Sequence, residues 1–236
     1  MNDTVEDSFS ITYHFKFNDK EIRQYNILLD KKTLCLNSDI RSAPPSWIKL
    51  NYHQCPICPL DEGLHKYCPV ALNLSDIAEE FKEFHAYEKV NVTVVTKERA
   101  YSKDTTIQEG LGSLIGIIMA SSGCPVMDYL RPMVRFHLPF ASLEETVYRT
   151  VSMYVMAQYI LELNGRYSDK KLGGLEEIYF NVGQVNKHIA KRLAGVSGKD
   201  ANINALSNLD CFASLVPLEV GDMVKSIESY LYAYLK

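Results

Sequence analysis

The sequence lacks an excess of basic residues, and it lacks a long apolar run. Lys and Arg number 25 against 29 Asp and Glu, which gives a formal net charge of -4. Proteins that bind nucleic acids or anionic membranes over a broad surface are usually basic, so neither kind of partner is predicted. The apolar run at residues 111–120 is interrupted by Gly116 and is too short to cross a bilayer.

The amino end lacks the basic and apolar regions of a signal peptide, because residues 1–7 are polar and acidic apart from Met1 and Val5. A cytoplasmic protein is therefore expected. The cytosol keeps thiols reduced, so the six cysteines favour metal or redox chemistry over structural disulfides. With 47% hydrophobic and 23% charged residues, the chain has an ordinary globular composition, and we expect a single domain over residues 1–236.

Residues 8–50 show the patterns of β-structure. Apolar and polar residues alternate from Phe9 to Phe17, which predicts a strand with one buried face. Further strands are predicted at 21–29, with Ile22 among its apolar residues, and at 33–36, and the stretch 47–50 is a candidate for another. Turns at 18–20 and 30–32 would join the first three strands into an antiparallel meander.

The middle of the chain mixes loop, helix and strand. Residues 51–69 have no periodic pattern and hold three cysteines, two histidines and three prolines. An irregular stretch of this length inside a domain is often functional. Residues 70–141 are predicted to be mixed, and their elements are a helix at 74–84, a strand at 90–95, a helix from a Thr106–Glu109 capping box to about Ser121, and a helix starting at Cys124-Pro125.

Residues 142–236 are predicted to be helical. Ser142 and Glu145 form a capping box, and apolar stripes at helical spacing follow at 143–155, 175–193, 203–212 and 220–235. The fold class is therefore α+β, with an N-terminal antiparallel β-meander, a cysteine-bearing loop and a helical C-terminal half. The tyrosines on these stripes fit either a core or the interface of a homodimer.

Four of the six cysteines are followed directly by proline, namely Cys55, Cys58, Cys68 and Cys124. With 9 prolines in 236 residues, composition alone would place a proline after roughly one cysteine in twenty-six. The four are therefore expected to share one environment. Cys55 and Cys58 have the spacing that lets two thiolates meet one metal, and proline suits the first position of helices after Cys68 and Cys124.

Four thiolates suit an iron–sulfur cluster, such as a 4Fe–4S cluster, or a tetrahedral zinc ion. Pro59 occupies the place where zinc knuckles usually carry glycine, which favours the iron–sulfur cluster. Two alternatives remain: buried small residues before helix-starting prolines, and a thiol–disulfide enzyme using Cys55 and Cys58. Cys35 and Cys211 are predicted to be core residues outside the site.

Other polar residues are candidates for supporting roles. His53 and His65 flank the loop cysteines and could replace one of them as a ligand. Arg131, Arg135 and His137 follow Cys124 and would place positive charge near an anionic cluster or bind an acidic ligand. Lys103 precedes a predicted helix start, where anions can bind. For each of them, an ordinary solvated or hydrogen-bonded side chain is the alternative.

The chain resembles, over roughly residues 10–165, a bacterial protein family of unknown function. The resemblance rests on the Cys55–Leu60, Tyr67–Pro69, Ser102–Thr106, Ser122–Pro125 and Arg131–Phe140 segments. It implies a bacterial cytosolic protein and carries over no catalytic residue. Three hypotheses follow: an iron–sulfur protein for redox sensing, electron transfer or cluster-dependent catalysis, with a small molecule or redox partner; a binding module with structural zinc; and a metal-free helical scaffold.

Overall fold

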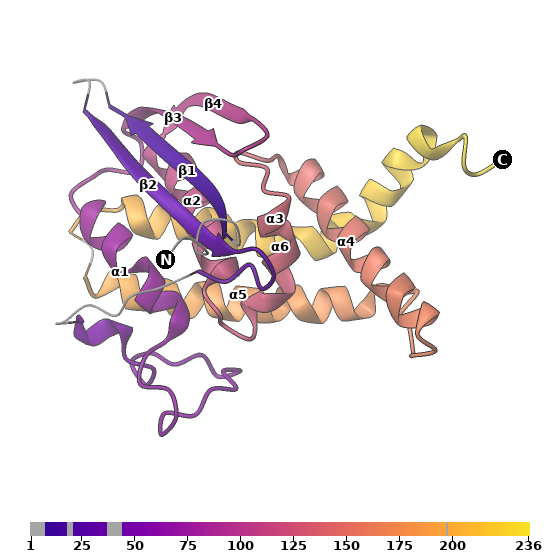
Figure 1. Cartoon of the computed structure of the whole chain (residues 1–236), viewed down its shortest axis with the longest axis horizontal. Coiled ribbons are helices and arrows are strands. Elements are labelled where there is room, and N and C mark those ends of the chain that lie inside the picture. Colours follow the sequence, from indigo (N-terminus) through magenta and orange to yellow (C-terminus); the bar gives the residue numbers. More distant parts are fainter. Residues whose placement is uncertain (1–7, 18–20, 37–43, 197) are drawn as a thin grey trace, which may run out of the picture.

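A computed structural model describes residues 8–17, 21–36, 44–196 and 198–236, and it combines an antiparallel sheet with a helical C-terminal half (Figure 1). The α+β class predicted from the sequence is confirmed. The strands are β1 (Ser8–Lys16), β2 (Ile22–Asp30), β3 (Lys89–Val95) and β4 (Ala100–Thr106). The α-helices are α1 (Pro69–Glu80), α2 (Ile107–Ser121), α3 (Arg131–Arg135), α4 (Leu143–Leu163), α5 (Gly173–Ala194) and α6 (Ala201–Glu228). The short 3-10 helices are η1 (Ser46–Ile48), η2 (Met127–Leu130) and η3 (Ser229–Leu231).

The sheet has the strand order β2-β1-β3-β4, with every neighbouring pair antiparallel. β1 lies inside it because its alternation buries a complete apolar face, including Ile11, Tyr13 and Phe15. This face packs against helices, since the Phe15 ring lies 5.3 Å from that of Phe81, just after α1. A side chain on Gly110 of α2 would also collide with the sheet.

The predicted N-terminal meander is correct for its first two strands and wrong after them. Residues 33–36 form only a single bridge, between Leu29 and Leu36, because Leu34 turns the chain with a φ of 55°. Ile22 is 59% exposed, since it lies on the opposite face of β2 from Tyr25. Residues 46–48 form η1 instead of a strand. The predicted turn at 18–20 lies outside the described residues.

The sheet is completed by β3, as predicted, and by β4, which the sequence analysis missed. β4 reads Ala-Tyr-Ser-Lys-Asp-Thr-Thr, and only Thr105 among its residues is buried. An edge strand with a solvated face shows no apolar alternation, so the sequence analysis interpreted these residues only as the start of the following helix. The predicted capping box at Thr106 is also absent, because Glu109 accepts its hydrogen bond from the Thr105 hydroxyl.

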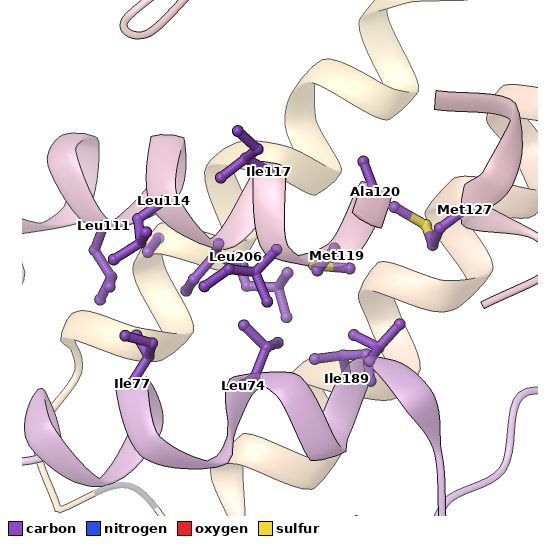
Figure 2. Close-up of a cluster of buried hydrophobic side chains, with 14 of the residues drawn as sticks. Leu74, Ile77, Leu111, Leu114, Ile117, Met119, Ala120, Met127, Ile189 and Leu206 are labelled. Atoms are coloured by element: carbon purple, nitrogen blue, oxygen red, sulfur yellow. The ribbon is translucent and has the colours of Figure 1, made fainter. Parts of the chain in front are cut away.

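Helix α2 lies in the core between the sheet and the C-terminal helices (Figure 1). It is apolar on almost every side, as expected for a helix covered all round. Figure 2 shows its Leu111, Leu114 and Met119 among side chains of α1, α5 and α6. Close approach to α6 depends on Gly112, where an added Cβ would lie 3.4 Å from the Ala205 carbonyl oxygen.

The capping box that begins α4 is confirmed: Ser142 Oγ accepts the Glu145 N–H at 3.2 Å, and Glu145 Oε2 accepts the Ser142 N–H at 2.8 Å. The stripe predicted on α4 is buried at Val147 and Tyr154 but not at Val155, which is 49% exposed. Other apolar side chains of α4 are also exposed, namely Tyr148, Met156, Tyr159, Ile160 and Leu163. The homodimer stays a prediction.

The stripes predicted at 203–212 and 220–235 belong largely to one helix, α6, which contains Pro217. Its first half packs on α2 and α5, whereas Val224, Leu231 and Leu235, toward the carboxyl end, are exposed. Helix α1 starts at Pro69, five residues before the predicted start. Among the described residues, no helix is both long and apolar enough to cross a membrane.

Candidate metal centre

The cysteine loop is closed at its base by backbone pairing between residues 48–50 and 66–68. The Leu50 N–H donates to the Lys66 carbonyl at 3.1 Å, and the Cys68 N–H donates to the Ile48 carbonyl at 2.9 Å. Lys49 and Tyr67 form an antiparallel bridge between these two segments. The irregular stretch predicted from the sequence is therefore a loop with a fixed base, and Cys68 lies at that base.

Cys55 and Cys58 lie on one tight turn within this loop. The Cys58 N–H donates to the Cys55 carbonyl at 3.0 Å, which places both side chains on the same turn. The Gln54 side chain donates to the Leu60 carbonyl at 3.1 Å and closes the turn from outside. Both cysteines are half-buried and pack against the hydrophobic core.

Cys68 precedes α1, as its proline predicts. It is the N-cap residue, and Pro69 takes a first-turn position where a missing N–H costs no helical hydrogen bond. Burial raises the pKa of the Cys68 thiol, and the charge of Arg192 together with the backbone N–H groups of Ala71 and Val70 opposes that increase. Because the side chain is buried, these positive and polar groups are the ones that would stabilise a thiolate there.

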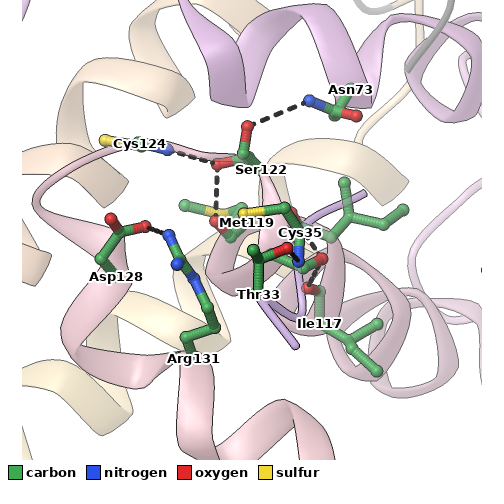
Figure 3. Close-up of polar contacts among 11 residues, drawn as sticks. Thr33, Cys35, Asn73, Ile117, Met119, Ser122, Cys124, Asp128 and Arg131 are labelled. Carbon is green, nitrogen blue, oxygen red and sulfur yellow. Dashed lines mark hydrogen bonds and ion pairs between the residues drawn. The ribbon is translucent and has the colours of Figure 1, made fainter. Parts of the chain in front are cut away.

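Cys124 lies in a similar environment on another segment. Gly123, with a φ of 82°, turns the chain after α2, and the backbone N–H groups of Met127 and Val126 lower the pKa of the Cys124 thiol against the larger effect of burial. Figure 3 shows the Cys124 N–H donating to Ser122 Oγ, at 3.3 Å. In the same view, the Asn73 amide of α1 donates to the Ser122 carbonyl at 3.5 Å and joins this segment to the helix that Cys68 begins.

The structure brings the four Cys-Pro cysteines into one neighbourhood. Burial raises the pKa of Cys55 to about 12, and the charges of Cys68, Cys124 and Cys58 contribute to that increase. Burial likewise raises the pKa of Cys124 to about 11. The N–H groups of Met127 and Val126 lower this pKa, and the charges of Cys68 and Cys58 raise it by smaller amounts. Cys35 and Cys211 do not contribute to either shift.

These thiols are neighbours, but they are not placed as ligands of one ion. Within the described ranges, no group of three or more His, Cys, Asp or Glu side chains has a geometry that could hold a metal ion. The mutual effects on pKa establish proximity, whereas ligation also requires the sulfurs to face a common point.

A buried cation, Arg192 of α5, lies close to Cys55 and Cys68. It is 1% exposed and donates to the carbonyl oxygens of Trp47 and Lys49 at 2.7 Å and of Leu50 at 2.9 Å. Its charge lowers the pKa of Cys55 and Cys68 against the effect of burial. No carboxylate of the described residues forms an ion pair with it, and its Nε has no hydrogen-bond partner among them.

The sequence analysis did not identify Arg192 as a functional residue. The residue follows Val185 by seven positions and Ile189 by three, so it continues the apolar stripe of α5. A charged residue on a buried stripe is the signal that identifies it, because isolated charges are rarely buried without a partner.

The two cysteines assigned to the core differ from that prediction. Cys35 is half-buried and follows the turn after β2, outside any strand, where its N–H donates to Thr33 Oγ1 (Figure 3). Cys211 is exposed, because the stripe through Phe212 faces a cavity described below. Both lie outside the four-cysteine neighbourhood.

The histidines, arginines and lysine predicted to support the site do not lie together. His53 and His65 are exposed on the loop, and the His53 carbonyl oxygen lies 3.2 Å from His188 Nδ1. Arg131 forms an ion pair with Asp128 (Figure 3). Arg135 lies over the Phe9 ring at 4.8 Å. His137 and Lys103 instead line the same cavity as Cys211.

Comparison with known proteins gives one result. A scan against models of protein families matches residues 11–232 to a family described as Domain of unknown function (DUF6901). Neither the curated proteins nor the solved structures contain a match to the chain.

Proposed function

The chain belongs to this family of unknown function, and from its site we propose a metal–thiolate protein that holds an iron–sulfur cluster on Cys55, Cys58, Cys68 and Cys124. The proposed role is redox sensing, electron transfer or cluster-dependent catalysis in the cytoplasm. An iron–sulfur cluster supplies a site that accepts and releases single electrons at a potential set by its surroundings.

The observation that carries the proposal is the buried guanidinium of Arg192 close to two of the four thiols, those of Cys55 and Cys68. Burying an arginine without a carboxylate is costly, and a nearby anion offsets that cost. The neutral thiols provide no such anion, since burial raises the pKa of Cys55 to about 12. Four thiolates around a metal centre leave a net negative charge, which this arginine would balance.

The donors around the sulfurs fit the same centre. Backbone N–H groups of Val70 and Ala71 near Cys68, and of Val126 and Met127 near Cys124, lower the pKa of these thiols against the effect of burial. Hydrogen bonds to cluster sulfurs and limited solvent exposure are the features by which proteins set the potential of such a cluster. The sulfurs of Cys55 and Cys58 would turn toward the other two on binding, because rotation about χ1 redirects a cysteine sulfur without moving the backbone.

A structural zinc site is the second candidate. It is favoured by the tight turn through Cys55 and Cys58, whose 3.0 Å hydrogen bond gives the two-cysteine arrangement typical of zinc sites. In that case the ion would fix the cysteine loop to the helices, and the protein would be a binding module.

Elemental analysis and an absorption spectrum of anaerobically purified protein separate these candidates. We expect iron and sulfide, with a broad band near 400 nm, roughly where thiolate-ligated clusters absorb. Zinc at about one equivalent would instead support the structural zinc site and contradict the iron–sulfur cluster. Absence of both metals from protein prepared without chelator would contradict the metal–thiolate proposal.

Single substitutions then test the ligand set. Cys58→Ser and Cys124→Ser should each lower the metal content and the melting temperature. Cys211→Ser is the matched control, because Cys211 is exposed and contributes no charge effect at the other thiols. Full metal content in Cys124→Ser would show that the four-ligand assignment is wrong.

A further inference from the structure

We propose that a cavity of about 490 Å³ between the helices of the C-terminal half and α2 binds an apolar molecule that carries one carboxylate group. Ligand pockets typically have volumes of about 300–1,000 Å³, so this cavity is large enough for a small organic acid. None of the four Cys-Pro cysteines lines it, and the proposal is independent of the metal–thiolate centre.

The wall of the cavity is predominantly apolar. Its apolar side chains come from α2, η2, α3, α5 and α6 and from the segment after α3, and they include Met119, Met127, Met133, Leu130, Phe140 and Phe212. Figure 2 shows the side chains of Ala120 and Met127 next to each other, and both residues line the cavity. Unbranched methionine side chains adapt to the shape of a ligand, so this wall suits a flexible or flat apolar body.

One cation in the cavity has no charge partner. Lys103 forms an ion pair with Glu109 at 3.3 Å, so the charges of these two lining residues cancel. Arg149 of α4 donates to the carbonyl oxygens of Met133 at 3.2 Å and Phe136 at 2.7 Å, and none of the described carboxylates forms an ion pair with it.

The negative charge of Glu145 acts on Arg149, but this carboxylate already accepts the Ser142 N–H in the capping box. The charged groups lining the cavity therefore sum to one positive charge when His137 is neutral. Arg149 already donates to two carbonyl oxygens, and its single positive charge balances one negative charge on a ligand. This favours a monocarboxylate over a phosphate dianion.

A buried amide also lacks a partner. Asn186 of α5 lines the cavity and is 2% exposed, yet its side chain forms no hydrogen bond with any described residue. Buried amides in proteins are nearly always hydrogen-bonded, so an unpartnered one beside a cavity indicates a ligand group that completes it. A carboxylate or a carbonyl oxygen on the ligand supplies the acceptor.

A hydrogen-bonded chain completes the polar part of the wall. Tyr13 Oη lies 3.0 Å from Ser113 Oγ and 2.5 Å from His137 Nε2, and both Ser113 and His137 line the cavity. These neutral groups orient a polar ligand head without adding charge. The cavity thus has one cation, a few neutral donors and a long apolar wall, which match an amphipathic acid.

Isothermal titration calorimetry of the full chain tests the inference with decanoate, kept below its micelle concentration, and with decanol as the uncharged probe. We expect decanoate to bind at least tenfold more tightly than decanol. Arg149→Met should lower the affinity for decanoate at least tenfold and leave that for decanol unchanged. The matched control is Arg135→Met, because Arg135 is the last residue of α3 and does not line the cavity, and both affinities should remain within twofold.

A second variant covers the case in which Arg149→Met does not fold. Ala213 lines the cavity and is 4% exposed, so Ala213→Leu fills empty volume and should abolish binding of both probes. The inference is overturned if the wild-type chain does not bind decanoate, if decanol binds equally well, or if Ala213→Leu leaves decanoate binding unchanged.

Discussion

At the scale of single residues, Arg192 has a structural task as well as an electrostatic one. Its guanidinium holds the carbonyl oxygens of Trp47, Lys49 and Leu50, which lie where η1 leads into the cysteine loop. These contacts join α5 to residues about 140 positions earlier in the chain, and no other described side chain donates to these three oxygens.

We predict that Arg192→Met lowers the free energy of unfolding by about 3 kcal/mol or more, because buried carbonyl groups lose charged donors. Chemical denaturation followed by circular dichroism measures this loss. The matched control is Lys191→Met, since Lys191 is the exposed neighbour on the same helix and should change stability by less than about 0.5 kcal/mol. Equal stability of the two variants would contradict the assigned role of Arg192.

His137 makes stability depend on pH. Burial, with a smaller effect of the Arg149 charge, lowers its pKa from 6.5 to about 3 in the folded chain. Between these two values the unfolded chain binds a proton that the folded chain does not, so stability falls as the pH is lowered through 6.5 toward 3. Above pH 6.5 both states are neutral at this residue, and it adds no pH dependence.

From pH 7 to pH 5 we therefore expect His137 to account for a loss of about 1–2 kcal/mol, at 1.36 kcal/mol for each unit of pKa difference. His137→Gln, which keeps a hydrogen-bonding group, should show a smaller loss over the same interval. Urea denaturation at the two pH values measures both proteins. Identical pH dependence of the variant and the wild type would be evidence against a neutral, buried His137.

Residue patterns predicted the neighbourhood of the four cysteines but missed the groups that surround it. The repeated Cys-Pro pairs are local and visible in the sequence, and Cys68 was placed correctly before a helix. The helix predicted to start at Cys124-Pro125 is wrong, because residues 125–126 form a turn and helical structure begins with η2 at Met127. The partners of Arg192 are carbonyl groups about 140 residues away. Asn186 is unusual only because its buried side chain has no hydrogen-bond partner among the described residues. Neither property is encoded in spacing along the chain.

At the scale of elements, the contact between α2 and the sheet depends on Gly110. A Cβ added there would lie 2.6 Å from Val92 Cγ2 and 3.0 Å from a ring carbon of Phe15, and both side chains are fully buried. Val92 has little freedom to rotate, so the helix would have to shift away from the strands.

We predict that Gly110→Ala lowers the free energy of unfolding by about 1–3 kcal/mol, despite the better helix propensity of alanine. Gly221→Ala is the matched control, because Gly221 lies in α6 with no atom within 4 Å of the added Cβ and should gain up to about 1 kcal/mol. Thermal denaturation of both variants gives the comparison. A stabilised Gly110→Ala variant would show that α2 and the sheet do not pack this closely.

Elements with strong periodicity were predicted well, and elements shaped by their position in the fold were not. β1 and α5 each bury one continuous face, which leaves a clear pattern in the sequence. β4 is an edge strand with polar residues, and α6 continues through Pro217, which sequence rules would place at a helix end. The limits of both elements are set by tertiary contacts that a local pattern does not contain.

At the scale of the whole molecule, the four cysteines connect three parts of the fold. Cys55 and Cys58 belong to the cysteine loop, Cys68 begins α1, and Cys124 follows the core helix α2. A centre bound to all four would cross-link the loop to two helices and would favour the folded state over the unfolded one. The free energy of metal binding would then add to that of folding.

Removal of the metal should therefore lower the melting temperature of the entire chain in one cooperative step. We expect differential scanning calorimetry to show a decrease of several degrees after anaerobic chelation, since about 1 kcal/mol corresponds to roughly 2–4 °C in a domain of this size. Cys58→Ser, which should already lack a complete ligand set, provides the control in which chelator has a smaller effect. If chelation lowers the melting temperature of Cys58→Ser as much as that of the wild type, the stabilising metal is not bound by these cysteines. If chelation changes neither protein, the thiols contribute to stability by packing alone.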